Sequence, residues 1–109
     1  MAQSPVAELS TASFETEVLE SQQPTIVFAS AGWNGPAELT ATTVEALAGE
    51  FESEVKTVRV DVDRAPELAA NYSIDAVPAF LLFVDGEVVD RRHGALTHDE
   101  LEELYRRGL

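Results

Sequence analysis

The segment Thr25-Ile-Val-Phe-Ala-Ser-Ala-Gly-Trp-Asn-Gly-Pro-Ala37 joins two different patterns and decides the fold. Its first part, entered from Pro24, is a nearly continuous apolar run of the kind found in strands buried on both faces. From Asn34 to about Phe51, apolar residues recur at helical spacing. We therefore expect a buried strand over Thr25–Ala29 that leads through a short loop into a long helix.

The next segments repeat this change from strand to helix. Residues 55–62 alternate between apolar and polar side chains, which indicates a strand. Pro66 then suits the first turn of a short helix, which we expect to run to Asn71. This order favours an α/β arrangement over separate blocks of helices and strands.

The last third of the chain predicts a hairpin and a final helix. Ala79–Val84 is a second apolar run, and Asp85-Gly86 is a strong turn signal that leads into another strand. Gly94 should end that strand. Thr97–Glu100 has the pattern of a capping box, which marks the start of a helix whose inward side chains are Leu101, Leu104 and Tyr105.

The first residues complete the plan with a short strand near Val6 and a helix from Ser13 to Leu19. The predicted order of elements is βαβαβαββα. We therefore expect an α/β fold with a central mixed sheet flanked by helices on both faces. The length suits a single domain over residues 1–109.

The charge of the chain is strongly negative, with 20 acidic residues against seven lysines and arginines and a net charge of −13. This argues against a nucleic-acid partner, because neutralising phosphates requires clustered cations. The acidic residues are spread along the whole chain, which favours a role in solvation over a binding patch. A composition this acidic, with a single lysine, resembles that of proteins from salt-adapted archaea.

Other classes of chemistry lack the residues that they need. The chain has no cysteine, which excludes thiol–disulfide chemistry. Its two histidines, His93 and His98, have no distinctive ligands beside them, so we expect no metal and no cofactor. No apolar run approaches the roughly 20 residues of a membrane span, and no secretory signal is evident. We expect a cytoplasmic protein with no membrane partner, and its oligomeric state stays open.

Several motifs, in order and at consistent spacing, resemble those of the thioredoxin family. Ala31-Gly32-Trp33-Asn34-Gly35-Pro36-Ala37 is similar to the family's W-C-G-P-C segment, Ala76-Val77-Pro78 to its cis-proline loop, and His93-Gly94 to the segment before its last helix. The resemblance covers about residues 8–109. It implies the thioredoxin fold and a cis bond before Pro78.

The resemblance also shows where the family's redox machinery is missing. Asn34 and Ala37 stand at the positions of the two cysteines, and Asn34 is a favourable residue for capping the helix. Phe28 stands where active members keep a buried aspartate, which would be costly to bury beside hydrocarbon. Ser30 stands at a tryptophan position, and Arg59 replaces a lysine near the aspartate. Together these replacements favour natural loss of the chemistry over removal by an engineer.

The same resemblance implies a binding face that outlasts this loss, because thioredoxins bind extended peptides beside the active site. The residues that would form it are Trp33, Gly35, Pro36, Val77, Pro78 and Gly94. Two functions stay open at this point, beside a stability or salt-adaptation scaffold that has no ligand. One is a redox-inactive module that binds a protein or an extended peptide, and the other is a cysteine-free, inactivated form of a protein-disulfide oxidoreductase.

Overall fold

The computed structural model describes residues 5–31 and 35–109, with side chains described from Thr40 onward in the second range. Its elements follow the predicted order, with one added π-helix, η1. They are β1 (Val6–Leu9), α1 (Thr11–Phe14), η1 (Glu15–Leu19), β2 (Thr25–Ser30), α2 (Gly35–Glu50), β3 (Lys56–Asp61), α3 (Pro66–Asn71), β4 (Ala79–Val84), β5 (Glu87–His93) and α4 (His98–Arg107). The predicted α/β fold class is confirmed.

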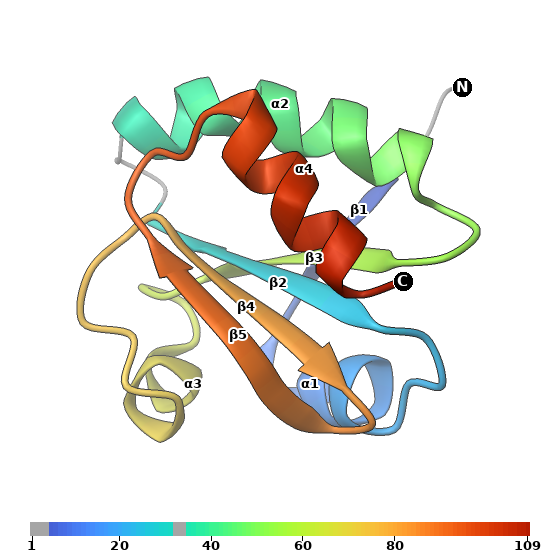
Figure 1. Ribbon diagram of the computed structural model, residues 1–109. Helices are drawn as coiled ribbons and strands as arrows, with labels where there is room; N and C mark the ends of the chain where they lie inside the picture. The colour runs from blue at the N-terminus through green and yellow to red at the C-terminus, as the bar shows by residue number, and fades with distance from the viewer. Residues whose placement is uncertain (1–4, 32–34) are drawn as a thin grey trace, which may run out of the picture.

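The five strands form one mixed sheet in the order β1-β3-β2-β4-β5. Strands β1, β3 and β2 are parallel, whereas β4 runs antiparallel to both β2 and β5. Figure 1 shows α2 and α4 together on one face of the sheet, with α1 and α3 on the other. The predicted helix-flanked mixed sheet is therefore confirmed.

The apolar run of β2 is fully buried because both faces of the sheet are covered. Ile26 and Phe28 belong to the core beneath α2 and α4, while Val27 belongs to the core that α1 and α3 cover. Successive side chains on a strand point to opposite faces, so this alternation follows from strand geometry. Strand β2 therefore contributes side chains to the hydrophobic cores on both faces of the sheet.

The first helix differs from the prediction, which placed one helix from Ser13 to Leu19. The observed α1 starts earlier, because the Ser10 side chain caps it in a reciprocal arrangement with Ser13. Its continuation is the π-helix η1, in which the Glu17 carbonyl accepts a hydrogen bond of 2.8 Å from Lys56 Nζ on β3. This tertiary contact has no counterpart in the local sequence pattern.

The predicted hairpin and capping box are confirmed. Asp85 and Gly86 both have positive φ, 53° and 80°, which is the conformation of a tight hairpin turn. A Cβ atom at Gly86 would lie 2.9 Å from the Leu19 carbonyl oxygen, so no larger residue fits there. At the start of α4, Thr97 and Glu100 cap each other's backbone N–H groups.

Four segments meet at one end of the sheet and prepare the candidate site. The backbone N–H of Val62, just after β3, donates to the Ser30 carbonyl at the end of β2 at 2.8 Å. On the other side of β2, the N–H of Gly94 donates to the Pro78 carbonyl at 2.8 Å. Helix α2 begins at Gly35, five residues after β2 ends, so the start of the long helix follows directly from this end of the sheet.

Candidate binding site

The buried part of the site is built around the Phe28 ring in β2. Phe28 is 1% exposed, and its ring stacks on that of Phe80 with centroids 5.1 Å apart and planes 5° apart. In the sheet register, Phe28 lies between Phe80 on β4 and Arg59 on β3. The position that the resemblance assigns to a buried acid is thus filled by an aromatic stack.

Arg59 completes this cluster from the other side. Its guanidinium carbon lies 5.2 Å from the centroid of the Phe28 ring, within the range of a cation–π interaction. Its Nε donates to Ser30 Oγ at 3.0 Å, which satisfies a hydroxyl that is 1% exposed. We call Phe28, Ser30, Arg59 and Phe80 the ring cluster.

A hollow of about 190 Å³ lies beside the ring cluster, between α2 and the strands at the β1 edge of the sheet. Phe28 and Val44 contribute apolar surface, and Arg59 contributes the only cation among its lining residues. The residues that line it are Val6, Glu8, Phe28, Ala41, Val44, Glu45 and Arg59. The ring cluster therefore has a margin that opens beside the middle of the long helix.

The second part of the site is the connection from α3 to β4, which carries the cis-proline predicted from the resemblance. The Val77–Pro78 bond is cis. Pro78 is buried, Val77 is half-buried, and Gly94 beside them is exposed with φ of +87°. A glycine suits this left-handed backbone, which places the Gly94 N–H on the Pro78 carbonyl.

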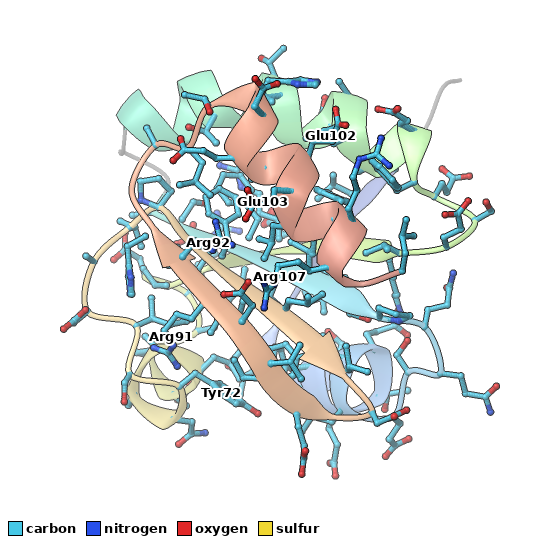
Figure 2. All side chains as sticks on the ribbon, in the orientation of Figure 1. Tyr72, Arg91, Arg92, Glu102, Glu103 and Arg107 are labelled. Atoms are coloured by element: carbon cyan, nitrogen blue, oxygen red, sulfur yellow. The ribbon has the colours of Figure 1, made fainter. Side chains whose placement is uncertain are left out.

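Strand β5 holds this connection at its other end through Arg91, a residue that the sequence analysis did not select. Arg91 Nη2 donates to the Tyr72 carbonyl at 2.5 Å and Nη1 donates to the Ser73 carbonyl at 3.2 Å. Figure 2 shows the Arg91 side chain extending from β5 toward the end of α3. The sequence signal was a pair of adjacent arginines at the end of a predicted strand, but the pattern does not reveal their partners.

The opposite face of β5 carries an ion-pair network that fastens α4. Asp90 Oδ2 lies 2.8 Å from Arg107 Nε and 3.2 Å from Arg92 Nη2, and Arg92 also contacts Glu103 (Figure 2). Burial alone would raise the pKa of Asp90. Hydrogen bonds from the Arg92 side chain and the Arg91 backbone, with the charges of Arg92 and Arg107, outweigh burial and hold that pKa below its usual value.

The remaining residues selected from the sequence fall partly outside the described part of the chain. Trp33 and Asn34 lie outside the described residues, so the predicted helix cap is not tested. Gly35 and Pro36 open α2. Ala37 follows them in the same helix, and the side chains of this first turn also lie outside the description.

Neither of the two histidines belongs to a group of described residues that could hold a metal ion. His98 Nδ1 lies 3.7 Å from Asp99 and 3.8 Å from Glu102, while His93 is exposed at the end of β5. Across residues 5–31 and 35–109, no group of three potential ligands has the arrangement to hold a metal ion. Within the same residues, no helix combines the length and apolar character of a membrane span.

The fold and the site define a class of protein: an α/β domain with a cis-proline at the end of the sheet where β2 ends and the chain goes on to its long helix. Comparison with known proteins identifies the family, because the Thioredoxin family model matches residues 5–107. The chain therefore belongs to the thioredoxin family.

Individual relatives agree with this assignment over most of their length. The protein named Thioredoxin of Porphyra purpurea is 37% identical over 97 residues, which cover 89% of this chain and 91% of the relative. Thioredoxin 1 of Nostoc sp. is 32% identical over 106 residues, covering 97% and 99%. Thioredoxin 1 of Synechococcus elongatus is 38% identical over 90 residues, covering 83% and 84%.

Proposed function

We propose that this chain is a redox-inactive thioredoxin-family domain, spanning residues 1–109, that binds a protein or an extended peptide. The residues proposed to make contact are Trp33, Gly35, Pro36, Val77, Pro78 and Gly94, which we call the docking face. The observation that carries the proposal is the absence of cysteine from the sequence. A domain without a thiol cannot form the mixed disulfide through which dithiol exchange proceeds.

The ring cluster supports natural loss of the redox chemistry. A chain whose cysteines alone had been replaced would keep the buried acid and the space around it. Here Phe28 stacks on Phe80 and lies under Arg59, and Arg59 in turn satisfies Ser30. Several positions thus fit one another in a packed arrangement, which removal of two thiols does not explain.

The cis-proline loop supports the binding part of the proposal. An extended peptide pairs with exposed backbone groups, and alternate side chains supply selectivity. The loop that ends in the cis Val77–Pro78 bond lies beside Gly94. Gly94 is exposed, and so are Asp75 and Ala76, the two loop residues before Val77. A partner strand could therefore approach this part of the molecule from solvent.

The second candidate function is an inactivated form of a protein-disulfide oxidoreductase. The names of the relatives favour it, since each compared relative is called a thioredoxin. The two candidates differ in what happens when the thiols are restored, because an inactivated enzyme retains the surroundings that dithiol chemistry requires.

The deciding experiment is the double variant Asn34→Cys/Ala37→Cys, assayed for reduction of a protein disulfide in the presence of dithiothreitol. Asn34→Ser/Ala37→Ser is the matched control, since it alters the same positions without a thiol. We expect negligible reduction by the cysteine variant, because Phe28 leaves no proton acceptor at its position. Reduction well above the control would favour the inactivated oxidoreductase.

Binding is tested with a library of capped decapeptides presented to the parent domain and to Trp33→Ala. We expect the parent to select peptides that the variant binds more weakly, because aromatic side chains anchor interfaces. Val89→Ala is the control, since Val89 is an exposed apolar residue on β5 that is 52% accessible and outside the docking face. Equal binding by parent and Trp33→Ala would remove Trp33 from the docking face.

We also infer that the acidic surface is an adaptation to high salt. The net charge of −13 favours unfolding through self-repulsion at low ionic strength, and dissolved ions screen it. The melting temperature should rise as salt increases from about 0.1 M to about 1 M, where the Debye length falls from about 10 Å to about 3 Å. A melting temperature that does not change over this range would contradict the inference.

A further inference from the structure

The connection from α3 to β4 is held at both of its ends by residues 91–94, which comprise the end of β5 and the glycine that follows it. At its start, the Arg91 guanidinium donates to the carbonyls of Tyr72 and Ser73. At its end, the Gly94 N–H donates to the Pro78 carbonyl at 2.8 Å. The intervening residues 74–77 therefore span the gap between two attachments, one to β5 and one to the residue that follows it.

Arg91 holds the backbone just beyond the end of α3. The carbonyls of Leu68, Ala69 and Ala70 in the last turn already accept hydrogen bonds from backbone N–H groups, so the Arg91 guanidinium binds the carbonyls that follow the helix, those of Tyr72 and Ser73. Ser73 also adopts a positive φ of 55°, which is uncommon for a residue with a side chain. The Arg91 fork binds the carbonyls at this turn, where the chain leaves α3 and enters the loop.

We propose that Arg91 is a positioning residue of the docking face, which fixes the path of residues 74–77 from the far end of the loop. The inference rests on the proposed function, because it assigns Arg91 a role in binding and not only in folding. Arg91 acts through the loop backbone, so its loss should loosen the loop more than it loosens the sheet.

The geometry of the guanidinium group predicts different effects for different substitutions of Arg91. Arginine presents two N–H donors in a fixed planar fork, whereas lysine presents a compact ammonium on a flexible stem. Arg91→Lys keeps the charge and can still donate to a carbonyl, but it lacks the planar fork. Arg91→Gln lacks both the charge and the fork. The protection of the loop should therefore decrease in the order arginine, lysine, glutamine.

The experiment is amide hydrogen exchange on the full chain, comparing the parent with Arg91→Gln and Arg91→Lys. Arg106→Gln is the matched control, since Arg106 is an exposed arginine on α4 that pairs with Glu102 at 2.9 Å. We expect residues 74–77 to exchange about tenfold faster in Arg91→Gln, the effect of losing one charge-assisted hydrogen bond, with a smaller increase in Arg91→Lys. Exchange in β4, at residues 80–83, should change much less.

Two outcomes of the exchange experiment would overturn the inference. One is an unchanged exchange rate at residues 74–77 in Arg91→Gln. The other is an equal increase in the loop and in β4, which is the signature of a role in overall stability alone. Slower exchange at residues 74–77 in Arg91→Lys than in Arg91→Gln supports positioning. A general loss of stability would not depend on the number and geometry of the hydrogen-bond donors at position 91.

A binding measurement separates this inference from the proposed function. A fluorescein-labelled decapeptide selected on the parent should bind Arg91→Gln several-fold more weakly, while Arg106→Gln binds as the parent does. Equal affinity for parent and Arg91→Gln, with a loosened loop, overturns the positioning role and leaves the docking face intact. A parent that selects no peptide overturns the docking face, while the exchange data still show whether Arg91 anchors the loop.

Discussion

The two parts of the candidate site are held together by different forces. The ring cluster is a packed assembly in which Phe28 lies between an aromatic ring and a guanidinium, away from water. The cis-proline loop is held by hydrogen bonds that Arg91 on β5 and the N–H of Gly94, just after β5, donate to backbone carbonyls. The first depends on side-chain shape and the second on the position of the backbone.

This difference explains how one part can change while the other keeps its form. Side chains in a core can be replaced together if their total volume and fit are preserved. The loop has less freedom, since its path depends on a positive φ at Gly94 and on the hydrogen bonds donated by Arg91 and by the Gly94 N–H. We expect perturbations of the ring cluster to affect stability most, and perturbations of the loop to affect binding most.

The largest effect should come from Phe28→Ala, which removes the central ring of the cluster. We expect a loss of about 3–5 kcal/mol in the free energy of unfolding, because the change leaves a cavity and removes buried apolar area. Urea denaturation at fixed salt measures it. Val89→Ala should change stability by less than about 0.5 kcal/mol, since Val89 is exposed. A similar result for the two variants would contradict the packing role of Phe28.

The next effect should come from Arg59→Met, which keeps an apolar stem but removes the cation over Phe28 and the donor to Ser30. We expect a loss of about 1–2 kcal/mol, the sum expected for a cation–π contact and a buried hydrogen bond. Arg59→Lys should cost less, because it keeps a charge near the ring. If Arg59→Met were as stable as the parent by urea denaturation, Arg59 would not be part of the cluster's packing.

Gly94→Ala probes the loop side of the comparison. No atom lies within 4 Å of the position that a Cβ would occupy, so any cost comes from the backbone φ of +87°. We expect a loss of about 1 kcal/mol, and a smaller loss for Gly94→Asn because asparagine tolerates positive φ. The selected decapeptide should lose affinity for Gly94→Ala while Arg59→Met retains it. Weaker peptide binding by Arg59→Met, with unchanged binding by Gly94→Ala, would contradict the division between a ring cluster that sets stability and a loop that sets binding.

The smallest effect should be a pH dependence from Asp90, which fastens β5 to α4. Its pKa in the folded state is lowered, so its contribution is present above the unfolded pKa of about 3.9 and is lost as the pH falls through the folded value. The difference in unfolding free energy between the parent and Asp90→Asn should therefore be constant near neutral pH and narrow below about pH 4. A difference that grows as the pH falls would contradict this assignment.

The sequence predicted most of the fold because the informative patterns are local. The apolar runs around Phe28 and at Ala79–Val84, the Asp85-Gly86 turn and the Thr97 capping box each describe an element through its own residues. The predicted helix over residues 13–19 is present, but the sequence did not predict its π-helical part, η1, or the hydrogen bond from Lys56 to the Glu17 carbonyl across 39 residues of chain. A pattern within one segment contains no record of such a contact.

For the candidate site, the sequence by itself determined that no thiol chemistry is available. The resemblance to a family implied that Phe28 stands at the position of a buried acid. It also implied the cis bond before Pro78. Only the tertiary structure decided that Arg59 lies over the Phe28 ring and that Arg91 reaches the carbonyls at the end of α3. The physical reason is that these partners lie on different strands and helices, so the packing of the sheet chooses which polar groups meet.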